Sequence, residues 1–212
     1  MPDRTLPSRN RREFLQTGLA TGAVIITGIP ASAQENPMPD GLRQALEHEK
    51  LGAVLGNPSG DVTLTEFFDY NCPYCRASVA DLHRLILEDQ QLRVVLREWP
   101  VFGAGSLYCA KVSLASLRQG KFWQFHTSLM RIKGPADDKS AIATASSVGL
   151  NMGELRRDME DINIARQIEH SWILAENMGL SGTPTYIAGD FGAFGQQSLD
   201  ELRSMIAEVR GA

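Results

Sequence analysis

Residues 62–75 read VTLTEFFDYNCPYC, and this stretch decides the fold. The apolar run over residues 62–70 is typical of a buried strand, and apolar residues at helical spacing follow over residues 77–88. The CPYC motif at residues 72–75 therefore stands where a strand ends and a helix begins. A CxxC motif in that setting is more typical of redox chemistry than of a structural role.

The start of this helix favours a negatively charged sulfur. Backbone N–H groups in the first turn lack intrahelical partners and carry the positive end of the helix dipole. Pro73 suits the first helical position, because the N–H that proline lacks would have no partner there. We therefore predict that Cys72 is the exposed nucleophile with a lowered pKa. Cys75 begins an apolar stripe at helical spacing, so it is expected to point inward and to resolve the mixed disulfide. The other members of the stripe are Val79, Leu82 and Ile86.

Glu66 is an ionisable residue inside the predicted strand. Burial would raise the pKa of its carboxyl, which would suit it to accept the proton that Cys75 must lose. If the strand instead lies at a sheet edge, Glu66 faces solvent and has no such role. The spacing of the residues leaves both interpretations open.

A second candidate segment lies far downstream, where Gly182-Thr183-Pro184-Thr185 leads into a short β-prone run. An X-Pro bond at the entrance of a strand is a candidate cis peptide. If this loop faces the CxxC motif, the backbone of Thr183 could pair with an extended substrate peptide, and Pro184 would present no N–H to the two thiols. An ordinary turn before a strand is the other interpretation.

Together these residues resemble the DsbA-type thiol-disulfide oxidoreductases of the bacterial cell envelope, over about residues 53–210. The resemblance implies an α/β, thioredoxin-like fold with a helical insertion between a βαβ part and a C-terminal ββα part. It also implies that Pro184 is cis and that Glu66 is a buried proton acceptor. Substrate-binding positions, by the same resemblance, are Pro73, Tyr74, Thr183 and Pro184. The matching segments are 66–75, 97–103, 119–123 and 182–184.

The resemblance leaves the direction of the reaction open. Tyr74 is uncharged, whereas the histidine-containing version of the motif supplies local help to the thiolate, and this argues against a strong oxidant. Threonine before the cis proline occurs, by the same resemblance, in isomerases and reductases as well as in some oxidases. We therefore expect an enzyme that oxidises, reduces or isomerises disulfides, with cysteine-containing envelope proteins and a membrane redox partner as its partners.

The N-terminus predicts export. Residues 8–16, SRNRREFLQ, look like a twin-arginine signal, a mildly apolar stretch follows over 19–29, and Ala-Ser-Ala at 31–33 suits cleavage. The apolar stretch is too short and too weakly apolar for a convincing membrane span, although an uncleaved anchor is the alternative. We therefore expect a mature chain that begins at Gln34 in the periplasm, where an oxidising environment suits a CxxC motif.

The patterns predict a sequence of five segments. Residues 41–50 look like a short amphipathic helix, and residues 106–178 show only helical patterns. The segments are a signal peptide at 1–33, an N-terminal extension with a short helix at 34–60, the thioredoxin βαβ part at 61–104, the helical insertion at 105–180 and the C-terminal thioredoxin part at 181–212.

The charge of the chain argues against nucleic acid as a partner. The sequence has 212 residues, with 21 basic and 25 acidic side chains. Removing residues 1–33 takes away four basic and two acidic residues, which leaves a formal net charge of −6. The remaining length is ample for one domain with its own core.

A thiolate metal-binding protein is the alternative function. Cys72 and Cys75 could hold Cu(I) between two sulfurs, whereas a closed zinc site needs four ligands. The sequence has no second CxxC motif or nearby cysteine–histidine pair to supply the other two. We therefore expect no metal and no cofactor. A purely structural disulfide is a third interpretation.

Cys109 is the third thiol, and it breaks the even count expected of a secreted domain whose cysteines are all paired. It lies within a helical pattern, where a buried, unreactive thiol is the usual outcome. A redox or intermolecular role for Cys109 is the alternative.

Overall fold

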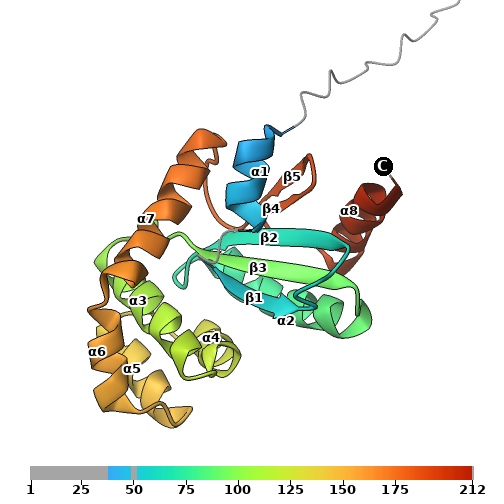
Figure 1. The fold of residues 1–212 in the computed structure, drawn as a ribbon. Helices are drawn as coiled ribbons and strands as arrows, with labels where there is room; N and C mark the ends of the chain where they lie inside the picture. The colour runs from blue at the N-terminus through green and yellow to red at the C-terminus, as the bar shows by residue number, and fades with distance from the viewer. Residues whose placement is uncertain (1–37, 49–51, 212) are drawn as a thin grey trace, which may run out of the picture. The chain divides into compact units, whose positions relative to one another are not determined.

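The sheet of the protein is mixed, and its strands lie in the order β1-β3-β2-β4-β5 (Figure 1). The computed structural model describes residues 38–48 and 52–211. β2 (Val62–Phe68) and β3 (Leu92–Glu98) run parallel in the middle of the sheet. α2 (Pro73–Glu88) connects them and completes the predicted βαβ unit.

Both edges of the sheet are short strands. β1 (Ala53–Gly56) pairs antiparallel with β3. The extension with a short helix that we expected at residues 34–60 did not include this strand, because four residues are too few to show an alternating pattern. β4 (Thr185–Ala188) pairs antiparallel with β2, and β5 (Phe191–Phe194) pairs antiparallel with β4.

A run of helices separates β3 from β4, as the helical patterns predicted. They are α3 (Ala104–Arg118), α4 (Phe122–Met130), α5 (Asp138–Ser147), α6 (Met152–Met159) and α7 (Ile162–Asn177). In Figure 1, α3 to α6 gather beyond the end of the sheet at which β3 ends. Asp137 and Ser140 form a capping box at the start of α5, and Asn151 caps α6. The thioredoxin-like α/β fold with a helical insertion is therefore confirmed.

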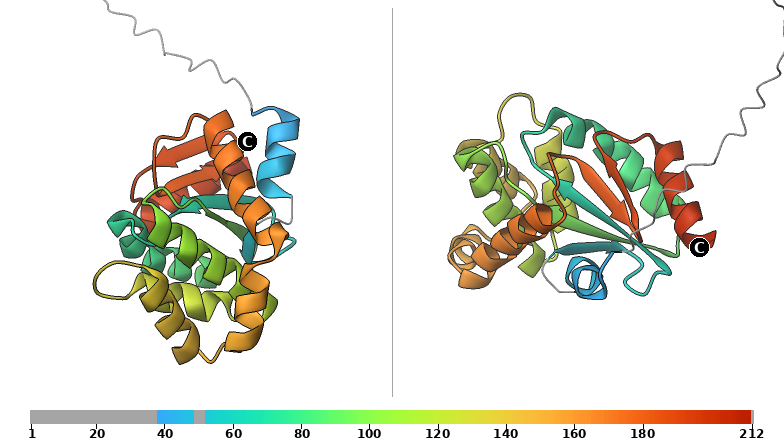
Figure 2. Two further views of the ribbon diagram at one scale, coloured as in Figure 1. Left: turned by 90° about the vertical axis from the view of Figure 1, so that its left-hand side faces the viewer. Right: turned by 90° about the horizontal axis from the view of Figure 1, so that it is seen from above.

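Helices cover both faces of the sheet (Figure 2). α2 and α8 (Leu199–Gly211) pack on one face, where Leu64 and Phe68 of β2 are buried. α1 (Asp40–Glu47) and α7 pack on the other face, where Phe67 is buried. Successive side chains of a strand point to opposite faces, so a strand covered on both faces needs the nearly continuous apolar run seen in the sequence.

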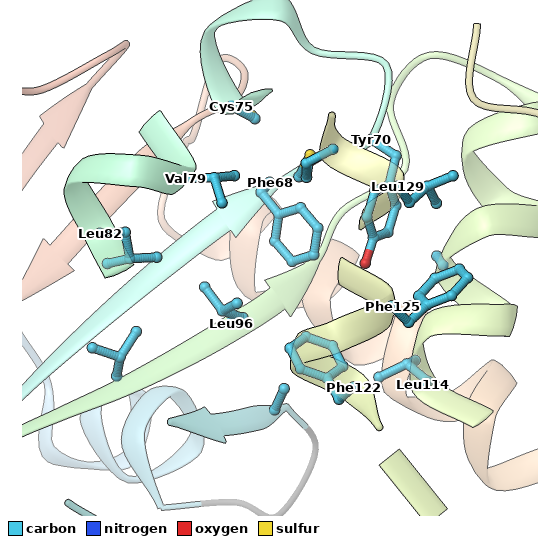
Figure 3. Close-up of a cluster of buried hydrophobic side chains, with 14 of the residues drawn as sticks. Phe68, Tyr70, Cys75, Val79, Leu82, Leu96, Leu114, Phe122, Phe125 and Leu129 are labelled. Atoms are coloured by element: carbon cyan, nitrogen blue, oxygen red, sulfur yellow. The ribbon is translucent and has the colours of Figure 1, made fainter. Parts of the chain in front are cut away.

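The larger core lies between α2 and the sheet and continues into the insertion. Figure 3 shows Val79 and Leu82 of α2 on the side of the helix that faces Phe68 and the sheet. Farther along, Tyr70 contacts Phe125 of α4 edge to face, with ring centres 6.2 Å apart. One apolar core thus joins the βαβ unit to the helical insertion.

The short helix α1 is held by arginines of β3. Arg97 is fully buried, and its guanidinium donates hydrogen bonds to the carbonyl oxygens of Ala45 (2.8 Å) and Leu46 (2.6 Å). Arg93 donates to the carbonyl oxygen of Glu47 at 2.6 Å. The last carbonyl oxygens of a helix lack intrahelical donors and carry the negative end of the helix dipole. The two guanidinium groups supply the missing donors and place positive charge at that end.

The predicted signal peptide at residues 1–33 lies outside the described residues. Within residues 38–48 and 52–211, no helix combines the length and the apolar character that crossing a bilayer requires.

Candidate active site

Cys72 lies at the N-cap of α2, directly before Pro73 in the first turn. Its sulfur accepts a hydrogen bond from the backbone N–H of Cys75 at 3.3 Å. The side chain is only 1% exposed, which corrects the expectation of an exposed nucleophile. The Cys72 thiol donates to the carbonyl oxygen of Thr183 at 3.2 Å, so the downstream loop lies against the sulfur.

The two thiols differ strongly in acidity. The pKa of Cys72 is lowered to about 6, chiefly because the Cys75 side chain donates a hydrogen bond to its sulfur, with help from the backbone N–H groups of Cys75 and Tyr74. Burial raises the pKa of Cys75, and its hydrogen bond to Cys72 and the charge of Glu66 raise it further. Cys75 is 1% exposed and lies on the inward face of α2 (Figure 3). Of the two thiols, Cys72 is therefore the one that can ionise near neutral pH, whereas Cys75 keeps its proton.

The loop before β4 lies next to the thiols. The Thr183–Pro184 peptide bond is cis. Two hydrogen bonds fix the loop. The Thr185 hydroxyl donates to the carbonyl oxygen of Gly182 at 2.7 Å, and the N–H of Gly195 donates to the carbonyl oxygen of Pro184 at 2.8 Å. The structure thus brings together two segments that are 111 residues apart in the chain.

Glu66 is buried in β2, which has β3 on one side and β4 on the other. This position excludes the alternative in which Glu66 faces solvent at a sheet edge. The Tyr186 hydroxyl donates a hydrogen bond to the Glu66 carboxylate at 3.2 Å. Burial raises the pKa of Glu66 to about 8, the bond from Tyr186 opposes this rise, and the charge of Cys72 adds to it. A carboxyl with that pKa can take and return a proton near neutral pH.

Tyr186 is a site residue that the sequence did not indicate. It is opposite Glu66 in the antiparallel register of β2 and β4, and its side chain is fully buried. Its position two residues after Pro184 was visible, but a tyrosine in a β-prone run is ordinary. Only the pairing of the strands shows that its hydroxyl meets Glu66.

An apolar groove of about 970 Å³ opens beside Cys72. Three aromatic side chains stand at the groove with more than half of their surface exposed: Tyr74 (59%), Phe102 (55%) and Phe194 (62%). No charged residue from the described part of the chain lines it. The CxxC motif indicated Tyr74 from the sequence but gave no sign of the two phenylalanines, because they come from the β3–α3 connection and from β5. The remaining lining residues are Cys72, Pro73, Trp99, Val101, Leu180, Ser181, Gly182, Thr183, Gly195 and Gln196.

Cys109 makes its hydrogen bond with a different part of the chain from the two thiols of the CxxC motif. It is fully buried, and its thiol donates to the carbonyl oxygen of Asp137 at 3.7 Å. Burial and the charges of Glu98, Asp69 and Asp137 raise its pKa to about 12. Such a thiol stays protonated and is a poor nucleophile.

His126 belongs to a buried polar group at the junction with the insertion. Its Nδ1 lies 3.1 Å from the Tyr70 hydroxyl, which also lies 2.7 Å from the hydroxyl of Ser113. Burial lowers the pKa of His126 to about 3, so the ring is neutral. Among the described residues, no group of three or more histidine, cysteine or acidic side chains is arranged to hold a metal ion.

Comparison with known proteins identifies a family. A family model described as a DSBA-like thioredoxin domain matches residues 63–207. A solved thioredoxin-like oxidoreductase from Silicibacter pomeroyi DSS-3 is 40% identical, with a TM-score of 0.78 over 80% of this chain and 98% of that one. The thiol-disulfide exchange protein alpha-DsbA2 from Wolbachia pipientis is 27% identical, with a TM-score of 0.75 over 80% and 92% of the two chains. A periplasmic thioredoxin-like protein from Salmonella enterica serovar Typhimurium is 25% identical, with a TM-score of 0.75 over 82% and 99%.

The chain is much shorter than some of its curated relatives. The Na(+)/H(+) antiporter NhaA 3 of Salinispora tropica is 24% identical over 155 residues, which cover 72% of this chain but 24% of the antiporter. The chain thus spans about a quarter of the length of that relative.

Proposed function

The chain belongs to the family of DsbA-like thioredoxin domains, and from this premise we propose that it is a thiol–disulfide oxidoreductase that acts through Cys72 and Cys75. The observation that carries the proposal is the unequal pair of thiols. The pKa of Cys72 is lowered to about 6, whereas that of Cys75 is raised. Cys72 can therefore attack as a thiolate, and Cys75 stays protonated until the second step.

In the dithiol form, the Cys72 thiolate attacks one sulfur of a substrate disulfide. The substrate S–S bond breaks, one substrate thiolate leaves, and Cys72 is joined to the other substrate sulfur. Cys75 then loses its proton to Glu66 and attacks the sulfur of Cys72, which releases the second substrate thiolate. The substrate gains two electrons and the enzyme ends with a Cys72–Cys75 disulfide. The same steps in reverse oxidise a substrate dithiol.

The groove supports a protein or peptide as the substrate. Its walls are uncharged and aromatic, and the loop at Thr183 and Pro184 forms one side of it next to Cys72. An extended peptide could pair with the backbone at Thr183 while apolar side chains enter the groove. Pro73 and Tyr74 would contact the peptide from the start of α2.

We place this activity in the periplasm, with cysteine-containing envelope proteins as substrates and a membrane redox partner that resets the thiols. Support comes from the twin-arginine pattern at residues 8–16 and from the small-residue cleavage site at 31–33. Microscopy of a fluorescent fusion to the full chain, compared with the same fusion in which Arg11 and Arg12 are both changed to Lys, tests the export step. Equal export of the two forms would contradict a twin-arginine signal.

The activity is tested by the reduction of insulin in the presence of dithiothreitol, after treatment of the protein with a metal chelator. We expect the wild-type protein to be active and Cys72→Ser to be inactive. Cys75→Ser should accumulate mixed disulfides with substrate, visible on non-reducing gels. Normal turnover by Cys72→Ser would disprove the assignment of the nucleophile, and loss of all activity on metal removal would favour a thiolate metal site.

A further inference from the structure

Two connecting segments and the first turn of a helix meet at the buried side chain of Asp69. The carboxylate accepts hydrogen bonds from the backbone N–H of Asn71 (2.6 Å) and from the hydroxyl of Ser106 (2.7 Å). Its second oxygen accepts from the backbone N–H of Phe102 at 3.0 Å. Asp69 is 1% exposed, so these bonds form away from water. A single carboxylate thus ties the β2–α2 connection to the β3–α3 connection and to the first turn of α3.

The backbone of the same residue holds the nucleophile. The carbonyl oxygen of Asp69 accepts a hydrogen bond from the backbone N–H of Cys72 at 3.1 Å. The side chain of Asp69 holds Phe102, and its main chain holds Cys72. One residue therefore links the backbone of the nucleophile to the backbone of Phe102 at the groove.

Asn71 extends this arrangement into the insertion. Its side-chain amide donates to the Ser106 hydroxyl (2.9 Å) and to the carbonyl oxygen of Ala136 (2.8 Å), and it accepts from the N–H of Ala136 (2.8 Å). The α3 helix approaches the same backbone closely, because a Cβ on Gly105 would lie 2.8 Å from the carbonyl oxygen of Ala136. The start of α3, which follows Phe102 in the chain, is thus supported from a second side.

We propose that Asp69 is a positioning residue for substrate selection, which holds Phe102 beside Cys72 so that disulfides flanked by large apolar side chains react preferentially. This inference rests on the proposed thiol–disulfide exchange. Phe102 is 55% exposed at the uncharged groove, and it can cover a substrate side chain only if its backbone is fixed. The reaction itself is the attack of Cys72 on the substrate disulfide described above.

The chemistry of Asp69 explains why a carboxylate stands there. Three donors converge on its two oxygens, and a carboxylate offers acceptors alone. Asparagine has nearly the same shape, but one of its two positions is an NH₂ group that would face a donor. Asp69→Asn therefore removes either the bond from the Phe102 N–H or the bonds that the other oxygen accepts from Asn71 and Ser106, while changing the volume very little.

The experiment compares two disulfides that react with the reduced full-length protein. One is a disulfide-linked peptide with phenylalanine next to its cysteine, and the other is glutathione disulfide, which has no apolar side chain to bind. The ratio of the second-order rate constants of Cys72 with the peptide and with glutathione disulfide measures selection. We expect Asp69→Asn to lower this ratio about tenfold, the scale of losing one partly buried aromatic contact.

A double substitution shows whether Asp69 acts through the position of Phe102 or through a general disturbance of the fold. Phe102→Ala should lower the ratio by a similar factor, and Asp69→Asn should lower it no further in the Phe102→Ala background. Asp138→Asn is the matched control, because it makes the same chemical change at an exposed position of α5 and should leave the ratio intact. If Asp69→Asn fails to fold by circular dichroism, Ser106→Ala takes its place with a smaller expected fall.

The role of Asp69 and the proposed function fail on different results. An unchanged ratio in folded Asp69→Asn, or an additive effect with Phe102→Ala, would overturn the role of Asp69. Reaction of the wild-type protein with neither disulfide would instead overturn the proposed function, and the inference with it.

Discussion

The Tyr186 hydroxyl donates a 3.2 Å hydrogen bond to the Glu66 carboxylate inside the sheet. The two residues are partners in the register of β4 and β2, and both side chains are buried. The bond lowers the pKa of Glu66, whereas burial and the charge of Cys72 raise it. Cys72 and Cys75, from the start of α2, also interact with the charge of Glu66. Tyr186 therefore keeps the pKa of the proposed proton acceptor within reach of neutral pH.

Replacing Tyr186 with phenylalanine should move the pH dependence of the resolving step. The variant keeps the ring but loses the donor, so the pKa of Glu66 should rise above about 8, by roughly one unit. A disulfide probe that releases one chromogenic thiolate on attack by Cys72 and a second on resolution by Cys75 separates the two steps. We expect only the second release to shift to higher pH. Tyr108→Phe is the control, and equal pH profiles for Tyr186→Phe and wild type would contradict the role of Tyr186.

Replacing Glu66 with glutamine should change how stability depends on pH. The pKa of Glu66 is raised from 4.5 to about 8 in the folded protein. Between these values the folded state keeps a proton that the unfolded state has lost, so the free energy of unfolding falls as pH rises through this window. Glutamine does not ionise, so Glu66→Gln should be more stable than wild type above pH 8, by about 5 kcal/mol, and nearly equal at low pH.

Urea unfolding of the reduced protein at a series of pH values measures this difference. The same variant should slow the release of the second thiolate more than the first, since only resolution needs the proton acceptor. A stability difference that does not depend on pH would show that the Glu66 carboxyl has an ordinary pKa.

The acidity of Cys72 should depend on the side chain at position 75. The hydrogen bond from Cys75 is the largest cause of the lowered pKa of Cys72. Cys75→Ala removes this donor but keeps the backbone N–H groups, so the pKa of Cys72 should rise by about one unit or more. Cys75→Ser keeps a hydroxyl donor and should cause a smaller rise. Thiolate absorbance measured against pH reports each value, and identical titration of the two variants would point to the backbone groups alone.

Docking of α1 should depend on the buried guanidinium of Arg97. Arg97→Met fills a similar volume but leaves the carbonyl oxygens of Ala45 and Leu46 without their donors. We expect a loss of about 2 kcal/mol in the free energy of unfolding and faster hydrogen exchange within α1. Arg84→Met is the control, because Arg84 is exposed on α2 and pairs with Glu88 at 2.7 Å, a contact worth at most about 1 kcal/mol. Unchanged exchange in Arg97→Met would show that α1 is held by its apolar contacts.

Much of the fold was predictable because its signals are local. The strand before Cys72, the helix after it and the long helical insertion all follow from the spacing of apolar residues, which needs no distant contact. β1 was missed because a four-residue edge strand is defined by its partner, β3, rather than by its own pattern. The exposure predicted for Cys72 was wrong for a similar reason, since the carbonyl of Thr183 that lies against its sulfur comes from a remote loop.

The sequence by itself determined that a sulfur at position 72 begins a helix and that a second sulfur at position 75 lies one turn inside it, because helix geometry follows from adjacent residues. Tertiary structure alone decided that Glu66 is buried, that Tyr186 bonds to it and that Phe102 and Phe194 stand at the groove. Each of these relationships joins segments that are far apart in the chain, and only the pairing and packing of strands and helices brings them together.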